Sequence, residues 1–173
     1  FIGPAAGQIA IKHIASNGGS IFSAGAAHPF ESSSRMVIIL NLFLIVIAPI
    51  SLIFTYGFAV KAINFSWSLY WIVVLVMGFS LHVLYLGETD YGVPLILVDR
   101  IIGDNFNYTG KELIYDKFPS LMWVLSITMS SNGTTNACLE NYSPLSTIFL
   151  FSNLVISKFI MEGVGSGFFA MLA

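Results

Sequence analysis

The sequence predicts an all-α membrane protein made of repeated units, each a short helix, a re-entrant loop and a long helix. Three observations predict this fold class. The chain is 56% hydrophobic and 9% charged, whereas a soluble domain carries about 25% charged residues. Two apolar runs, 36–60 and 63–86, reach the length of a membrane span, which is about 20 residues. Two shorter apolar stretches each end in Ser-Asn-Gly.

The composition limits the kinds of function that the chain can have. Its formal net charge of -2 provides no basic surface for nucleic acid. The single cysteine, Cys138, excludes an internal disulfide and a cysteine-rich metal site. The sequence has no initiator methionine and no signal-peptide pattern, so we expect an internal piece of a longer chain.

The two long apolar runs are expected to be antiparallel transmembrane helices. Run 36–60 contains no acidic or basic side chain, and run 63–86 contains only His82. The connection around Lys61 is short enough to be a tight helix–helix turn. Positive charge favours the cytoplasmic side, so we expect Lys61 inside and the polar segment 87–119 outside. Pro49 is expected to kink the first helix, which a membrane bundle tolerates.

The last apolar segment is expected to be a broken helix. Residues 144–156 are apolar, but two charges and three glycines then interrupt the pattern at about membrane depth: Lys158, Glu162, Gly163, Gly165 and Gly167. A glycine costs roughly 1 kcal/mol in a helix interior, and irregular backbone in a bilayer must line water or lie within protein. We expect a gating loop at 163–167, with the two charges as charge partners of groups elsewhere in the protein. The alternative is a kink used only for packing.

The two Ser-Asn-Gly tripeptides form an internal repeat at matching positions. They comprise Ser16, Asn17 and Gly18, and Ser131, Asn132 and Gly133. A short helix that does not cross the membrane must return its chain to the same side, and the returning loop exposes carbonyl oxygens. Dehydrated cations are suitable partners for such carbonyls, and glycine lets the backbone turn them towards one axis. Either loop alone is an ordinary turn or helix C-cap, but the paired copies favour a cation pathway.

Several ionisable residues near the first tripeptide need an explanation. His28 is expected to lie at the outer membrane boundary and to order its loop with Glu31; the alternative is a ligand or proton relay. His13 and His82 are expected to be packing or interfacial residues. Lys12 is unusual in a short apolar helix, because burying a lysine in a membrane is costly.

Four collinear motifs resemble the potassium-binding subunit of the bacterial Kdp potassium-transporting ATPase family. Residues 3–31, GPAAGQIAIKHIASNGGSIFSAGAAHPFE, resemble the second pore loop of that family. Residues 107–112, NYTGKE, resemble an external element. Residues 128–147, TMSSNGTTNACLENYSPLST, resemble the third pore loop, and residues 162–172, EGVGSGFFAML, resemble the glycine element that follows it.

The resemblance implies a fold of four helix–pore loop–helix repeats around one pathway, as in Trk, Ktr and HKT transporters. Residues 1–62 would hold the second pore loop and its following helix, and residues 63–173 the third repeat. The two tripeptides would then each form a quarter of a potassium selectivity filter that binds the ion through backbone carbonyls. The resemblance implies potassium as the only metal ion and no other cofactor.

The resemblance also implies a non-enzymatic subunit in a bacterial inner membrane, crossing it several times. ATP hydrolysis would belong to a P-type partner subunit, with small accessory subunits beside it and no nucleic acid. Departures from the family pattern predict a diverged member. Among them, Ser20 replaces a third glycine, Glu140 stands within a His-Asp-Ser position, and Lys158 at an acidic one. The alternatives are a standalone Trk- or Ktr-like transporter subunit and an intramembrane enzyme using His28 and Glu31.

Overall fold

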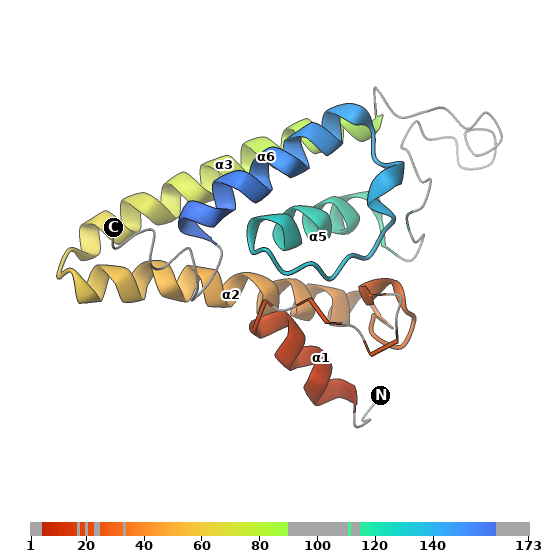
Figure 1. Cartoon of the computed structure of the whole chain (residues 1–173), viewed down its shortest axis with the longest axis horizontal. Coiled ribbons are helices and arrows are strands. Elements are labelled where there is room, and N and C mark those ends of the chain that lie inside the picture. Colours follow the sequence, from red (N-terminus) through yellow and green to blue (C-terminus); the bar gives the residue numbers. More distant parts are fainter. Residues whose placement is uncertain are drawn as a thin grey trace.

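The computed structural model describes residues 5–16, 18–19, 21–22, 25–32, 34–89, 111 and 115–161. These residues form five α-helices and two short 3-10 helices (Figure 1): α1 Ala5–Ile14, η1 Gly25–Ala27, α2 Arg35–Ala59, α3 Ile63–Thr89, α5 Lys117–Met129, η2 Leu139–Asn141 and α6 Pro144–Ile160. Over the described ranges the only β pairing is an isolated antiparallel bridge between Lys111 and Ala137. The predicted all-α class is therefore confirmed.

The two long helices form the antiparallel pair that the apolar runs predicted. Helices α2 and α3 are joined by a short turn, lie close together near it and diverge towards their other ends, where α5 lies between them (Figure 1). In that turn Lys61 takes a φ of 57°. Both helices are long and apolar enough to cross a membrane by length and composition. Helix α2 continues through Pro49 without interruption, and α3 extends to Thr89, past its expected end at residue 86.

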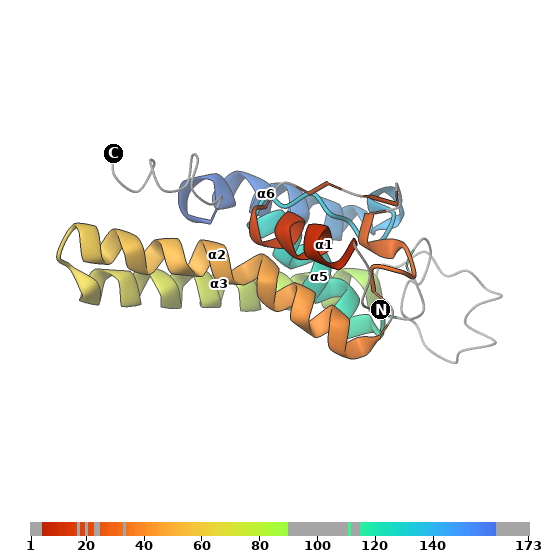
Figure 2. The ribbon, with the colours of Figure 1, turned by 90° about the horizontal axis from the view of Figure 1, so that it is seen from below.

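The two short helices lie beside the half of α2 that begins at Arg35 (Figures 1 and 2). Helix α1 has 10 residues and α5 has 13, so at 1.5 Å per residue they are about 15 and 20 Å long. The hydrocarbon core of a bilayer is about 30 Å thick. Neither helix is therefore long enough to cross it.

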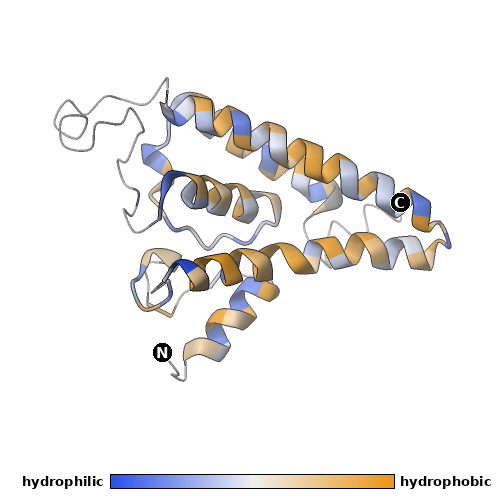
Figure 3. Cartoon of the chain, turned by 180° about the vertical axis from the view of Figure 1, so that it is seen from behind, coloured by the Kyte–Doolittle hydropathy of each residue, from blue (hydrophilic) through white to orange (hydrophobic). Residues whose placement is uncertain are grey.

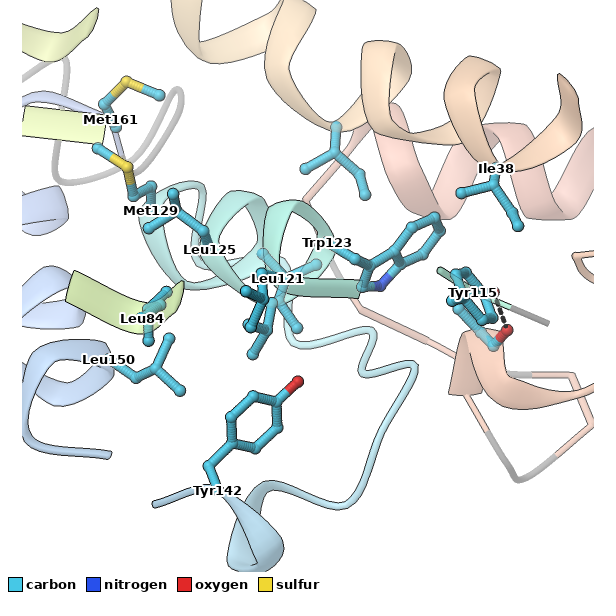
Figure 4. Packing of buried hydrophobic residues seen from close by; sticks show 14 of the residues in the cluster. Ile38, Leu84, Tyr115, Leu121, Trp123, Leu125, Met129, Tyr142, Leu150 and Met161 are labelled. Atoms are coloured by element: carbon cyan, nitrogen blue, oxygen red, sulfur yellow. Dashed lines mark hydrogen bonds between the residues drawn. The ribbon is translucent and has the colours of Figure 1, made fainter. Parts of the chain in front are cut away.

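Helix α5 is the centre of the hydrophobic core. Every residue from Trp123 to Met129 is buried. Figure 4 shows Trp123 on the side of α5 that faces Tyr115 and Ile38, while Leu125 and Met129 lie towards α6 and α3. Because α5 packs against α2, α3 and α6, it fixes where the loop at its C-terminal end lies.

Helix α6 begins and ends close to where the sequence predicts. Its N-cap Ser143 accepts a hydrogen bond from the backbone N–H of Ser146 at 3.2 Å, and Pro144 occupies the first helical position, where its missing N–H costs nothing. The helix ends at Ile160, and Lys158 is exposed on it. Glu162 and the glycine stretch 163–167, predicted as a gating loop, lie outside the described residues.

The outward faces of the long helices are strongly apolar. In Figure 3 the hydrophobic colour continues along α2, α3 and α6. Large side chains are exposed there, including Met36 at 79%, Leu75 at 70% and Ile148 at 68%. Apolar surface on this scale marks contact with lipid or with other protein segments.

Candidate cation site

The two Ser-Asn-Gly loops meet in the structure. We call α1, residues 15–34 and α2 the upstream unit, and α5, residues 130–143 and α6 the downstream unit. A Cβ added at Gly18 would lie 2.6 Å from Asn132 O and 3.1 Å from the carbonyl carbon of Gly133. Gly18 and Gly133 therefore lie close together, and each follows a short helix.

Both loops have the same backbone twist at equivalent positions. Ser16 and Ser131 take φ values of 51° and 52°, and Gly18 and Gly133 take 65° and 56°. Left-handed backbone costs roughly 1–2 kcal/mol for a residue other than glycine. Two serines that share this conformation indicate that the loop shape is built into both units. Asn17, the middle residue of the upstream tripeptide, lies outside the described residues.

Asn132 connects the downstream loop to the upstream helix. Its backbone N–H donates to Ile127 O at 2.9 Å, which closes the C-terminal end of α5. Its side-chain Nδ2 donates to His13 O at 3.1 Å and, more weakly, to Lys12 O at 3.5 Å. The residue is 0% exposed. Asn132 therefore bonds to both units at once.

A second set of contacts holds the loops together further along the chain. The backbone N–H of Ala26 donates to Thr135 O at 2.9 Å, and the Tyr115 hydroxyl donates to Ala26 O at 2.9 Å. Trp123 Nε1 donates to Thr134 O at 2.9 Å. The ring of His13 packs edge-on against the same indole, with centroids 5.5 Å apart. His13 is therefore a packing residue, as predicted.

A buried ion pair explains the unusual lysine of the first helix. Lys12 Nζ is bonded to Glu31 Oε2, and the two side chains are 5% and 0% exposed. The pair joins α1 to the far end of its own loop. His28 and Glu31 order the loop together, as the sequence predicts, through the backbone N–H of Glu31, which donates to His28 O. The Glu31 carboxylate faces Lys12, because a buried carboxylate requires a partner.

His28 has a local, structural setting. Its ring stacks on Phe22 with centroids 4.5 Å apart, and its Nδ1 accepts a hydrogen bond from the backbone N–H of Phe30 at 3.2 Å. The backbone N–H of Glu31 donates to His28 O at 2.9 Å, so His28 does help to order the loop. A catalytic His28–Glu31 pair is not formed, because Glu31 is bound to Lys12.

A second buried ion pair lies where the downstream unit begins. Lys111 Nζ and Glu88 Oε2 are 2.8 Å apart, with side chains 1% and 0% exposed, and Lys111 lies 4.1 Å over the ring of Tyr142. Burial lowers the pKa of Lys111, and the bond to Glu88 opposes that shift. The other carboxylate oxygen of Glu88 accepts from the Ser143 N–H at 2.9 Å. Glu88 thus fixes the N-terminal end of α6.

The electrostatics of the meeting point favour a cation. Each short helix ends at its tripeptide, and the C-terminal end of a helix carries about half a negative elementary charge. The last carbonyls of a helix lack intrahelical partners. Ser16, Gly18, Ser131, Asn132 and Gly133 lie at these two helix ends, and the carbonyls of Asn132 and Gly133 accept hydrogen bonds from the backbone N–H groups of Thr134 and Thr135. The positive charge nearest in sequence, Lys12, is neutralised by Glu31.

The bonds that join the two units were not predicted from the sequence. The Lys12–Glu31 pair was predictable in principle, since both residues are charges beside an apolar run, and either would be costly to bury alone. The Glu88–Lys111 pair was predictable for the same reason. The side-chain bond of Asn132 was not, because it spans 119 residues to His13.

The whole chain, residues 1–173, matches the family described as potassium-transporting ATPase A subunit, KdpA. The chain belongs to this family. The resemblance predicted from the four sequence motifs is thereby confirmed. The KdpA match also includes the segments that lie outside the described residues.

Similar proteins of the KdpA family are each named potassium-transporting ATPase potassium-binding subunit. The one from a Hydrogenobaculum species is 33% identical over 172 residues. Those from Nitratidesulfovibrio vulgaris and Pseudomonas aeruginosa are 34% and 32% identical over 171 residues. Each alignment covers 99% of this chain and 29% or 30% of the relative. The chain thus spans under a third of the length of these relatives.

Proposed function

We propose that this chain carries two of the four pore loops of a potassium-binding subunit that translocates potassium in an ATP-driven uptake complex. The observation that carries the proposal is the meeting of Gly18 with Asn132 and Gly133, in loops of matching twist. Family membership and the names of the relatives support potassium as the ion.

The filter would consist of the two tripeptides and bind potassium only through backbone carbonyls. Carbonyl rings replace the hydration shell of a potassium ion, so no side-chain ligand or further cofactor is needed. The dipole ends of α1 and α5 add to the attraction. The filter residues are Ser16, Asn17, Gly18, Ser131, Asn132 and Gly133.

A surface pocket supports the repeated pore-loop architecture of the Trk, Ktr and HKT type. Alignment of the N-cap serines, Ser34 and Ser143, makes Ile45 equivalent to Leu154. Ile45 is 0% exposed in the core shared with α5. Leu154 instead lines an open pocket of about 230 Å³, together with Thr128, Leu139, Glu140, Thr147, Leu150 and Phe151. A further unit packed there would cover the downstream unit as α5 covers the upstream one.

The glycine stretch after α6 would restrict the pathway beneath the filter. The end of α6 at Ile160 supports a helix that breaks before Gly163, Gly165 and Gly167. Lys158 and Glu162 would pair with charges on other repeats. Replacing the three glycines with alanine should favour continuous helix and alter transport, while potassium binding stays nearly intact. Unchanged transport and ATPase coupling would contradict a gating role.

The proposed partners are an ATP-hydrolysing P-type subunit and small accessory subunits, in a bacterial inner membrane that the subunit crosses several times. Two membrane-capable helices within this piece support that location. Co-purification with an ATPase subunit would distinguish the proposal from a standalone Trk- or Ktr-like transporter. Isolation of the full-length subunit without any ATPase partner would favour the standalone transporter.

The filter itself is tested by Gly18→Asp in the full-length complex. The new side chain would meet the Asn132 carbonyl and place a charge where neutral carbonyls line the path. We expect weaker potassium binding and poorer discrimination against other cations, measured by potassium-stimulated ATPase activity. Gly7→Asp is the matched control, because Gly7 has no atom within 4 Å of an added Cβ. Unchanged potassium uptake in Gly18→Asp would remove this site from consideration.

A further inference from the structure

The side chain of Asn132 makes a bond that a filter of backbone carbonyls does not require. Its amide nitrogen reaches the upstream unit and donates to His13 O at 3.1 Å. The two residues are 119 positions apart in the chain. Asn132 is 0% exposed, so water does not compete for this bond. A buried hydrogen bond of this kind fixes the relative position of the groups that it joins.

The carbonyls that Asn132 binds belong to the last turn of α1. The last four carbonyls of a helix have no partner within it. Ile11 O is satisfied by the backbone N–H of Ala15 at 2.8 Å, while His13 O and Lys12 O receive the Asn132 amide. The C-terminal end of the upstream helix is therefore capped by a side chain from the downstream loop.

Asn132 is also held firmly at its own backbone. Its N–H donates to Ile127 O at 2.9 Å, and its carbonyl oxygen faces Gly18 so closely that an added Cβ there would be 2.6 Å away. Backbone and side chain thus touch the upstream unit at two points, Gly18 and the end of α1. A change in the side chain would alter the spacing between the two loops.

We propose that Asn132 is a positioning residue that sets the spacing of the two loops and through it the ion selectivity. This inference rests on the proposed function. Selectivity between potassium and other cations depends on the number and spacing of the coordinating carbonyls. A threonine at this position would carry no side-chain amide N–H, so the bond to His13 O depends on the asparagine.

The test replaces Asn132 in the full-length complex and measures ATPase activity against potassium, rubidium and sodium. Asn132→Thr removes the side-chain amide donor and leaves a smaller polar residue. We expect the half-saturating potassium concentration to rise by about two- to tenfold, the range for one buried hydrogen bond, and the preference for potassium over rubidium and sodium to fall. Asn132→Asp should act more strongly, because its carboxylate would face two carbonyl oxygens.

The matched control is Asn41→Thr. Asn41 is 3% exposed on α2, and its side-chain nitrogen has no hydrogen-bond partner among the described residues. The control should keep the potassium preference of the unmodified complex. If Asn41→Thr lowered the potassium preference as much as Asn132→Thr, the inference would be overturned, because loss of any buried asparagine would then have the same effect.

Two further outcomes separate the inference from the proposed function. Unchanged selectivity in Asn132→Thr, together with weakened potassium binding in Gly18→Asp, would overturn the role of Asn132 and leave the filter in place. Unchanged binding in Gly18→Asp would overturn the proposed function itself. Altered selectivity in both, with a normal control, supports the inference.

Discussion

The upstream and downstream loops have nearly identical backbone twist and different surroundings. At Gly18 an added Cβ would lie 2.6 Å from Asn132 O, whereas at Gly133 it would meet no non-neighbouring atom of the described residues within 4 Å. The upstream glycine is thus required both for its φ and for its space, and the downstream one, in this chain, only for its φ of 56°. The close contact at Gly18 shows that the upstream loop faces the downstream unit there, while the corresponding side of the downstream loop is open among the described residues.

A second difference between the units concerns charge. Alignment of the N-cap serines makes Glu31 equivalent to Glu140, and alignment of the tripeptides makes Lys12 equivalent to Ile127. Glu31 is buried against Lys12, while Glu140 is exposed. The same backbone is therefore held by different side chains. Another unit that covers the downstream loop would remove the first difference, and it would also cover Glu140, which lines the pocket at Leu154; the difference between Lys12 and Ile127 would remain.

The largest expected effect comes from the equivalent glutamates. Glu31→Gln leaves Lys12 buried without its counter-charge and should lower the free energy of unfolding by about 3–5 kcal/mol. Glu140 is exposed here but lines the pocket that a further unit is proposed to cover, so Glu140→Gln should change the free energy of unfolding by less than about 0.5 kcal/mol unless that unit supplies a cation that pairs with it. Unfolding of the full-length subunit in detergent measures both. Equal losses would mean that the charge difference between the units is not real.

The next prediction compares alanine substitutions at Ile45 and Leu154, to test whether the pocket at Leu154 is filled in the complete subunit. Ile45→Ala should lower the free energy of unfolding by about 2–5 kcal/mol, as for other buried large-to-small changes. If a further unit covers the downstream one, Leu154→Ala should cost as much. The same unfolding experiment measures both variants. A nearly neutral Leu154→Ala would show that this groove faces lipid.

The next prediction compares alanine substitutions at Gly18 and Gly133, the glycines of the two loops. Alanine in left-handed backbone costs about 1–2 kcal/mol, and at Gly18 a clash with Asn132 O adds to this. In a complete ring Gly133 would meet the next loop in the same way, so Gly18→Ala and Gly133→Ala should have similar effects. The half-saturating potassium concentration of the complex reports both. A much smaller effect of Gly133→Ala than of Gly18→Ala would indicate that no other loop contacts Gly133 in the complete subunit.

The smallest effect is expected at the exposed ion pair between the units. Arg35, the first residue of α2, lies 3.1 Å from Asp116, and the two side chains are 78% and 59% exposed. Exposed pairs contribute about 0–1 kcal/mol, so Arg35→Ala should be almost neutral in the unfolding experiment. A loss comparable to that of Glu31→Gln would indicate that other segments bury this pair in the complete subunit.

The sequence predicted the helices and the repeat because their signals are local. Membrane spans require long apolar runs, so α2 and α3 could be located within a few residues. The matching tripeptides predicted two equivalent loops, and both have the expected position at the end of a short helix. These features depend on neighbouring residues, whose pattern is visible in a single sequence.

The bonds between the units could not be predicted in the same way. Asn132 appeared only as part of a tripeptide, and its bond to His13 O depends on how α5 packs beside α1. From the sequence, Glu31 was expected to act with the nearby His28, but its buried carboxylate is paired with Lys12, 19 positions away. For a buried carboxylate, the charge of a candidate partner therefore predicts the ion pair better than its distance along the sequence.

The separation between Asn132 and His13 has a consequence for the newly made protein. Synthesis proceeds from the N-terminus at about 5–20 residues per second, so the 119 residues that follow His13 up to Asn132 take about 6–24 s to produce. During that time α1 is present without the amide that caps it. The Lys12–Glu31 pair needs only residues already made, so this pair can close the first loop of the growing chain before Asn132 is added.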